Sequence, residues 1–288
     1  MAVEVQVPAP STARELRHLE ARIATALGEP VRLGVAFSGG VDSAVLLAVA
    51  ARALGPQRVL AVLGVSPSLA ADERELAHRV AEQIGVPLVE VPTAEGEVAA
   101  YRANGPDRCF HCKNELFTKI SDEVARRHGL DVVAYGENAD DARRPDRPGS
   151  AAATRHGVLR PLAAAGATKA QVRALARVFG LEVADKPAAP CLASRIPHFA
   201  EVTPAKLGQV ERAEAAMRRL GFADCRVRHH GEVARVELAE VDLVAAVQQP
   251  LRDDVVRAVR EAGFRFVALD LAGIQSGAFT LPLVADRG

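Results

Sequence analysis

Short apolar runs and helical patterns alternate through the first hundred residues. The apolar runs fall at 31–37, 58–65 and 87–91, and the helical patterns between them at 44–54 and 70–84. Strands joined by helices in this way run parallel, and a parallel sheet needs helices on both faces to bury it. The alternation therefore predicts an α/β fold built on a parallel sheet, which a further apolar run at 131–135 extends.

Other helical patterns flank this alternation. They run from 11 to 27, with Ser11 as the cap, over 113–128, and from Thr168 as the cap to Phe179. Residues 142–156 are rich in Arg, Pro, Asp, Ala and Gly, which predicts an exposed loop, and 158–160 predict a short strand.

From Pro204 the pattern changes. A long helix to 220 is followed by strands at 225–230 and 233–238, helices at 240–248 and 251–262, and a strand at 266–271. Two strands around a Gly-Glu turn predict an antiparallel hairpin. We therefore divide the chain into a domain of residues 1–200 and a small α+β domain of residues 201–288.

Composition excludes several classes of protein. The 36 Lys and Arg balance the 36 Asp and Glu, and aromatic residues make up 4%, so nothing marks a nucleic-acid surface. Four cysteines in 288 residues are too few for a disulfide scaffold. No run of about 18 apolar residues lacks charge, and the N-terminus has no signal-peptide pattern. We expect a cytoplasmic protein with reduced thiols and no membrane association.

The motif Ser-Gly-Gly-Val-Asp-Ser at residues 38–43 follows a predicted strand and opens a predicted helix. Glycines let the backbone approach a phosphate closely, and a helix N-terminus offers unpaired N–H groups and a positive dipole end. Ser38 and Ser43 add hydroxyl donors, and Asp42 suits Mg²⁺ bound to the phosphates. The loop lacks the Lys of a Walker A motif and is not G-x-G-x-x-G. The plain alternative is a Ser/Gly turn at a helix start.

The cysteines form a second constellation. Cys109 and Cys112 make a CxxC, and Cys191 lies in a Pro-bounded segment followed by Arg195. The CxxC leaves four roles open: half of a zinc site, a redox pair, a structural coincidence, or a site that handles sulfur or holds a cluster. A cation beside a thiol predicts increased thiolate character for Cys191. Cys225 begins a predicted strand and is expected to pack as a small apolar residue.

These segments resemble a known superfamily and one family within it. The Ser-Gly-Gly-x-Asp-Ser loop after the first strand is similar to the PP-loop of ATP pyrophosphatases, which cleave ATP to AMP and pyrophosphate. With three cysteines in the same domain, the chain resembles the LarE family of ATP-dependent sulfur transferases, which help to make the nickel-pincer nucleotide cofactor of lactate racemase. The matching segments are 38–43, 108–113, 136–141, 185–197, 227–231, 234–237 and 266–277.

The resemblance implies a role for each candidate site residue. The pyrophosphate part of ATP would be held by Ser38, Gly39, Gly40, Val41, Asp42 and Ser43, with Asp42 on Mg²⁺. The adenine would lie near Ala36 and Leu63, and further ATP contacts would come from Gly136, Asn138, Asp141 and Lys186. The implied substrate contacts are Arg108, Lys113, Arg195, Arg228 and His230. Each also has a plain alternative as a surface charge, a helix cap or a polar sheet residue.

The implied substrate is a pyridinium dicarboxylate mononucleotide, of which ATP adenylates one carboxylate before sulfur displaces AMP. In one version of the family, the cysteine that matches Cys191 gives up its own sulfur. In the other, cysteines matching Cys109, Cys112 and Cys191 hold a [4Fe-4S] cluster whose open iron carries sulfide from a sulfur donor. The presence of all three cysteines favours the cluster version. The family also implies a homo-oligomer, which can be a hexamer, with the second domain contributing to substrate binding and oligomerisation.

Three other functions compete with this interpretation. A tRNA thiolase of the same superfamily would need a basic RNA surface, which zero net charge disfavours, and a second CxxC pair, which the chain lacks. An amide-forming PP-loop ligase would need no cysteine constellation. A nucleotide-binding regulatory module would bind ATP without adenylating a carboxylate.

Overall fold

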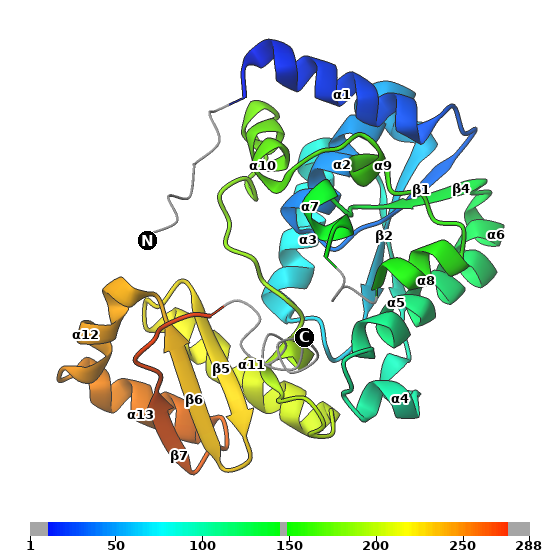
Figure 1. Ribbon diagram of the computed structural model, residues 1–288. Helices are drawn as coiled ribbons and strands as arrows, with labels where there is room; N and C mark the ends of the chain where they lie inside the picture. The colour runs from blue at the N-terminus through cyan, green and yellow to red at the C-terminus, as the bar shows by residue number, and fades with distance from the viewer. Residues whose placement is uncertain (1–10, 145–148, 276–288) are drawn as a thin grey trace, which may run out of the picture.

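The computed structural model describes residues 11–144 and 149–275 (Figure 1). Its larger sheet has four strands in the order β3-β2-β1-β4, and every neighbouring pair is parallel. The strands are β1 (Leu33–Ala36), β2 (Val59–Val65), β3 (Leu88–Pro92) and β4 (Val132–Tyr135). The predicted parallel α/β fold is confirmed. Because the strands are parallel, the loops that follow all four of them meet at one edge of the sheet.

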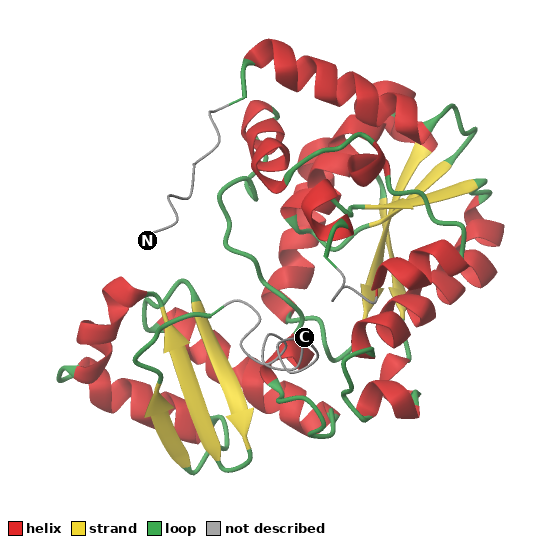
Figure 2. Ribbon diagram, viewed as in Figure 1, coloured by secondary structure: helices red, strands yellow, loops and turns green. Residues whose placement is uncertain are grey.

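Helices cover both faces of this sheet (Figure 2). The first face carries α1 (Ala13–Leu27), α2 (Val41–Leu54), α3 (Ala71–Ile84) and α10 (Lys169–Val178). The second carries α5 (Arg108–Lys119), which continues through η3 (Ile120–Val124) into α6 (Ala125–His128), and α8 (Gly149–Arg155). The short elements are η1 (Pro56–Arg58), η2 (Glu95–Glu97), α4 (Ala99–Arg102), α7 (Ala139–Ala142), α9 (Pro161–Ala164) and η4 (Leu192–Arg195).

The cap predicted for the first helix is wrong by one residue. Thr12, not Ser11, accepts a hydrogen bond from the Glu15 backbone N–H, and the Glu15 carboxylate accepts one from the Thr12 N–H at 2.6 Å. This reciprocal capping box satisfies two backbone donors at once, which a lone Ser11 hydroxyl would not do. Thr168 caps α10 as predicted.

The exposed loop predicted at 142–156 is wrong over residues 149–155. Residues 149–155 form α8, whose Ala152 and Ala153 are buried between the helix and the sheet. The short strand predicted at 158–160 is only an isolated bridge between Leu159 and Ala134. Residues 145–148 and the matching residues 276–277 lie outside the described part of the chain.

A second, smaller sheet follows with the order β5-β6-β7. Its strands are β5 (Cys225–His230), β6 (Val233–Leu238) and β7 (Phe266–Leu269), and its helical elements are α11 (Pro204–Arg219), η5 (Glu240–Asp242), α12 (Leu243–Val247) and α13 (Leu251–Glu261). The predicted hairpin is confirmed, since β5 and β6 pair antiparallel, whereas β7 joins β6 in parallel. Figure 1 shows this small unit in yellow and orange beside the larger one.

The core of the small unit reaches back into the first part of the chain. It includes Leu192, Ala193 and Ile196, which precede the predicted boundary at 201, and Tyr101 of α4. The N-terminus of α3 also contacts α11, because the Ala71 N–H donates to Glu211 at 2.7 Å. The segment that carries Cys191 is therefore packed between the two units. No helix in the described ranges is long and apolar enough to cross a membrane.

Candidate active site

The 38–43 loop lies where the sequence predicts it, between β1 and α2. Two serines close it: the Ser38 and Ser43 hydroxyl oxygens are 3.2 Å apart, and Ser43 donates to the Gly40 carbonyl at 2.9 Å. The Ser38 N–H also donates to the Ser43 hydroxyl at 3.3 Å. The N-terminal N–H groups of α2 therefore open onto a preshaped loop, as an anion site at a helix start requires.

Two glycines are required by close packing around this loop. Gly39 has φ +72°, and a Cβ there would stand 2.9 Å from the Cβ of Ala77 in α3. A Cβ on Gly136, which follows β4, would stand 2.7 Å from the Ser43 backbone nitrogen. Backbone atoms cannot move aside as side chains do, so only glycine fits at either position. Gly136 thus shapes the loop by letting the end of β4 approach it.

The acidic group of the loop is held from two sides. The amide nitrogen of Asn138 donates to Asp42 at 3.0 Å and to Asp141 at 2.9 Å, while its oxygen caps α7. The ammonium of Lys169, in the first turn of α10, forms an ion pair with the other oxygen of Asp42. Sequence reasoning missed Lys169. The only local hint was its place directly after the Thr168 cap, because the two charges lie 127 positions apart.

The two strand residues that the resemblance implies for adenine do not share one face of the sheet. Ala36 and Leu63 belong to different buried clusters, on opposite faces of the sheet. The register explains this, since Ala36 pairs with Val62, and moving one residue along a strand reverses the face. The Lys186 ammonium contacts the carboxylate of Glu73 in α3, at 2.5 Å from both oxygens.

The three cysteines of the sequence prediction come together across 80 residues of chain. Cys109 and Cys112 lie in the first turns of α5, and Cys191 directly precedes η4. Their charges interact: thiolates at Cys191 and Cys109 both act on Cys112, and one at Cys109 acts on Cys191. Cys225 is buried in the small unit, and burial raises its pKa to about 12, as expected of a packing residue.

The prediction that Cys191 has increased thiolate character is wrong. The residue as a whole is exposed, yet its thiol is enclosed, and this burial raises its pKa. Arg108 and Arg195 lower the pKa of Cys191 but offset the burial only in part. Burial and the neighbouring Cys191 and Glu95 likewise raise the pKa of Cys112. Burial thus disfavours the thiolate form of both Cys112 and Cys191.

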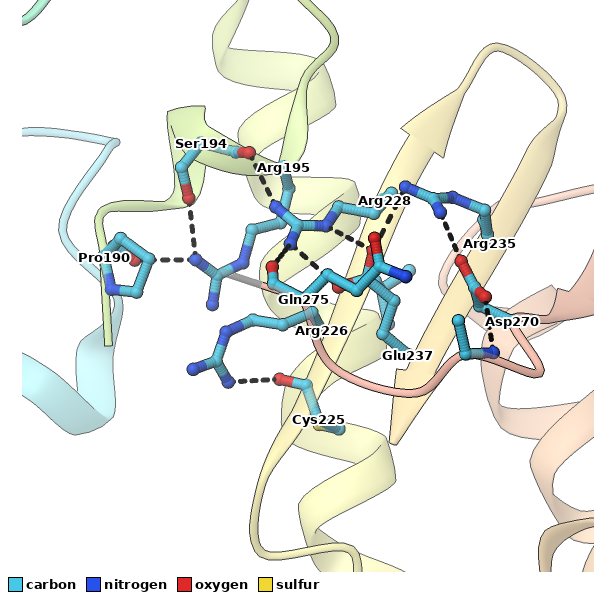
Figure 3. Close-up of polar contacts among 12 residues, drawn as sticks. Pro190, Ser194, Arg195, Cys225, Arg226, Arg228, Arg235, Glu237, Asp270 and Gln275 are labelled. Atoms are coloured by element: carbon cyan, nitrogen blue, oxygen red, sulfur yellow. Dashed lines mark hydrogen bonds and ion pairs between the residues drawn. The ribbon is translucent and has the colours of Figure 1, made fainter. Parts of the chain in front are cut away.

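Three arginines hold the backbone on both sides of Cys191: Arg195 in η4 and Arg226 and Arg228 on β5. Figure 3 draws the contacts of Arg195 and Arg228. Arg226 donates to the Ala188 carbonyl, Arg195 to the Pro190 carbonyl at 2.7 Å, and Arg228 to the Ser194 carbonyl at 3.0 Å. Buried carboxylates fix two of these cations.

Glu214 accepts from Arg195 at 2.7 and 3.1 Å, and Glu237 accepts from Arg228 at 3.0 and 2.8 Å. Arg195 and Arg228, predicted to contact substrate, therefore also carry the Cys191 segment.

The other predicted substrate residues lie in three places. Arg108 is buried and donates to Asn104 and to the Ala193 carbonyl, beside Cys191. The Lys113 ammonium lies 4.3 Å from the ring centre of Tyr135 at the end of β4. His230 is the last residue of β5, paired with Val233. Arg108 thus faces the cysteines, Lys113 the end of β4, and His230 the turn of the hairpin.

The donor types fit the two inorganic groups that the family implies. Asp42, a carboxylate at a phosphate-type loop, suits Mg²⁺, which prefers oxygen ligands. For a cluster, the fit lies in the chemistry of the donors: three converging thiols with no fourth protein ligand would leave one iron open. Within 11–144 and 149–275, no three His, Cys, Asp or Glu side chains are grouped to hold a single ion. A cluster spreads its thiolates over several irons, so it does not need them gathered around one point.

The chain is similar to several known proteins. The asparagine synthase family model matches residues 16–236. The chain is 33% identical to pyridinium-3,5-bisthiocarboxylic acid mononucleotide synthase of Lactiplantibacillus plantarum over 90% of this chain and 92% of that protein. It is 41% identical to an uncharacterized protein of Synechocystis sp. over 87% of this chain and 92% of the relative. A tRNA-specific 2-thiouridylase of Geobacter metallireducens is 30% identical over 54% of this chain and 52% of its own length. With the loop of residues 38–43 between β1 and α2 and the relatives matched over most of its length, the chain belongs to the LarE family of PP-loop ATP pyrophosphatases.

Proposed function

We propose that the chain is an ATP-dependent sulfurtransferase that adenylates a carboxylate of a pyridinium dicarboxylate mononucleotide and converts it to a thiocarboxylate, in nickel-pincer nucleotide biosynthesis. One observation carries the proposal: Cys109, Cys112 and Cys191 converge in a chain that also has the PP-loop. The similarity to a synthase of a bisthiocarboxylic acid mononucleotide over 90% of the chain supports the substrate class.

In the first step, the PP-loop would hold the pyrophosphate part of ATP through the N–H groups of α2 and the Ser38 and Ser43 hydroxyls. A substrate carboxylate oxygen attacks the α-phosphorus, and pyrophosphate leaves with the electrons of the broken P–O bond. Lys169 forms an ion pair with Asp42, and from this position its ammonium can balance negative charge that develops on the phosphates. Mg²⁺ on Asp42 would supply further charge neutralisation.

In the second step, sulfur attacks the acyl carbon and AMP leaves with the electrons of the broken C–O bond. Activation is required because an unmodified carboxylate oxygen is a poor leaving group. Arg195, Arg226 and Arg228 hold the carbonyls around Cys191, so this thiol has a fixed backbone whether it gives up its sulfur or ligates a cluster. Arg108 keeps a buried positive charge beside Cys191 and Cys109.

For the source of sulfur, we favour the cluster version over sacrifice of Cys191. Cys109, Cys112 and Cys191 would hold the [4Fe-4S] cluster, which when bound supplies an open iron at which sulfide can be carried. All three thiols have a use in that version, whereas sacrifice leaves the CxxC without one. Anaerobic reconstitution with iron and sulfide tests this directly: Cys109→Ala should lose cluster absorbance, Cys225→Ala should keep it, and full cluster content in Cys109→Ala would refute it.

Intact mass before and after turnover tests the function as a whole. The protein is incubated with Mg·ATP, the dicarboxylate mononucleotide and sulfide, and AMP, pyrophosphate and thiocarboxylate are measured. Unchanged protein mass over many turnovers supports the cluster version, and loss of about one H₂S at Cys191 supports sacrifice. ATP–pyrophosphate exchange that ignores the carboxylate under all conditions would favour a nucleotide-binding module instead.

The rival thiolase function has its own test. Stoichiometric, salt-sensitive binding of tRNA would favour it, and no such binding is expected from a chain with zero net charge.

The same proposal includes a homo-oligomer, up to a hexamer. Val241, Val244 and Val247 expose apolar surface at regular spacing along η5 and α12, and light scattering of the purified chain would measure its assembly.

A further inference from the structure

Asn104 has an unusual backbone conformation for its position. It lies in the turn between α4 and α5, is fully buried, and has φ +56°. Few residues other than glycine adopt this left-handed conformation, although Asn tolerates it better than most. A glycine would relieve the strain, so the Asn side chain must contribute something that glycine cannot.

That contribution is a set of hydrogen bonds to the segment that follows Cys191. The Asn104 amide nitrogen lies 3.2, 2.7 and 3.0 Å from the carbonyl oxygens of Ile196, Pro197 and Ala200. Its own backbone carbonyl accepts the Phe199 N–H at 3.1 Å. One residue just ahead of the CxxC therefore holds four positions within residues 196–200, a segment more than 90 residues away.

Arg108 extends the same connection toward the thiols. Its guanidinium donates to the Asn104 amide oxygen and, at 2.9 Å, to the Ala193 carbonyl two residues after Cys191. Arg108 begins α5 and directly precedes Cys109, so its position is fixed to the CxxC by covalent geometry. The buried pair Asn104 and Arg108 thus joins the helix that carries two thiols to the turn that carries the third.

We propose that Asn104 and Arg108 are positioning residues, which set α5 against the Cys191 segment and so fix the spacing of the three thiols. Neither residue needs to touch substrate for this role. The value of a fixed spacing rests on the proposed sulfur chemistry, but the spacing itself can be measured without ATP, iron or substrate.

The test uses a Cys112→Ala, Cys225→Ala background, in which Cys109 and Cys191 are the remaining thiols. Dibromobimane fluoresces when it bridges two thiols, so its rate of fluorescence gain reports their proximity. We expect Asn104→Ala to lower this rate about tenfold, which corresponds to the loss of roughly one net hydrogen bond. Arg108→Gln should also lower the rate of bridging. In both variants, a reagent that reacts with one thiol at a time should still alkylate Cys109 and Cys191.

Asn114→Ala is the matched control. Asn114 is an Asn on the same helix that bonds to His156 at 3.1 Å, away from the Cys191 segment. Asn104→Gly covers the case in which Asn104→Ala fails to fold, because it keeps the backbone conformation and removes only the side chain. Bridging in Asn104→Gly and Arg108→Gln that matches Asn114→Ala would overturn the proposal. Activity is measured separately in the chain with all four cysteines: if that chain forms no thiocarboxylate, the proposed function fails whatever the bridging result, and if it does, normal bridging refutes the positioning role alone.

Discussion

Exchanging Glu214 for Gln should weaken the small unit far more than an equivalent exchange on the surface. Glu214 and Arg195 form an ion pair with only 3% and 4% of their side chains exposed. Glu214 also accepts the Val227 N–H at 2.9 Å, so one carboxylate joins α11, β5 and the turn after Cys191. Gln keeps the shape and one acceptor oxygen, but it leaves the Arg195 charge buried without an opposite charge.

The expected magnitude follows from that burial. Removing one partner of a buried ion pair costs about 3–5 kcal/mol, because the desolvated charge that remains is uncompensated. Gln retains part of the hydrogen bonding, so we expect about 3 kcal/mol. At about 2–4 °C per kcal/mol for proteins of this size, the melting temperature should fall by roughly 6–12 °C.

Urea unfolding followed by far-ultraviolet circular dichroism measures this loss, since the chain has no Trp for fluorescence. The matched control is Glu20→Gln, which breaks an ion pair with Arg52 whose side chains are 24% and 62% exposed. We expect that control to cost less than about 1 kcal/mol. Equal effects from the two exchanges would refute the reasoning.

A double exchange separates stability from function. Glu214→Leu with Arg195→Met removes both charges, so the stability lost to an uncompensated buried charge should return, although the Val227 N–H still lacks its acceptor. The hydrogen bond from Arg195 to the Pro190 carbonyl does not return with it. We therefore expect a stable protein with slower sulfur transfer.

Three further results follow from the geometry. Gly136→Ala places a Cβ 2.7 Å from the Ser43 nitrogen, and overpacking of about 1–3 kcal/mol should weaken ATP binding about 5- to 150-fold by calorimetry. Lys169→Met leaves Asp42 without its ammonium partner and should slow carboxylate-dependent ATP–pyrophosphate exchange about 100-fold. Arg and His neighbours lower the pKa of Glu90 from 4.5 to about 2, so its stabilising contribution is complete above pH 4.5 and is lost as the pH falls toward 2. Glu90→Gln should flatten the melting temperature against pH in that window, by less than about 1 kcal/mol because the pair is partly exposed.

Each of these has a matched control. Gly96→Ala adds a methyl group with nothing within 4 Å, and should leave ATP affinity unchanged. Lys119→Met breaks an exposed helix pair with Glu123 and should leave exchange unchanged. For the acid window, Glu15→Gln removes a carboxylate whose pKa is also lowered, but by hydrogen bonds from Thr12 rather than by cations, so added salt should weaken the effect of Glu90→Gln and leave that of Glu15→Gln unchanged. A variant that merely matches its control would contradict the corresponding prediction.

Much of the framework was predictable because it depends on neighbours in the chain. Short apolar runs placed the parallel strands, period-3.6 patterns placed the helices between them, and the Gly-Glu turn placed the hairpin of 225–230 with 233–238. The PP-loop was predictable for the same reason, because its turn, hydroxyls and helix start lie within six residues. Helix α8 was missed because it is short and the Arg, Pro, Asp and Gly residues around it give the whole stretch a loop-like composition, although its three alanines favour a helix.

The sequence by itself determined the candidate functional groups: an ATP-type loop, a CxxC at a helix start, and one further thiol between prolines. Only the tertiary structure decided what they meet. It brought Lys169 to Asp42 and Asn104 to the turn after Cys191, both across more than 90 residues, where no local pattern reports a contact. It also reversed the expectation for Cys191. The adjacent cations predicted by sequence are present, but burial of the thiol outweighs them, because desolvation depends on atoms from every part of the fold and the sequence lists only those nearby along the chain.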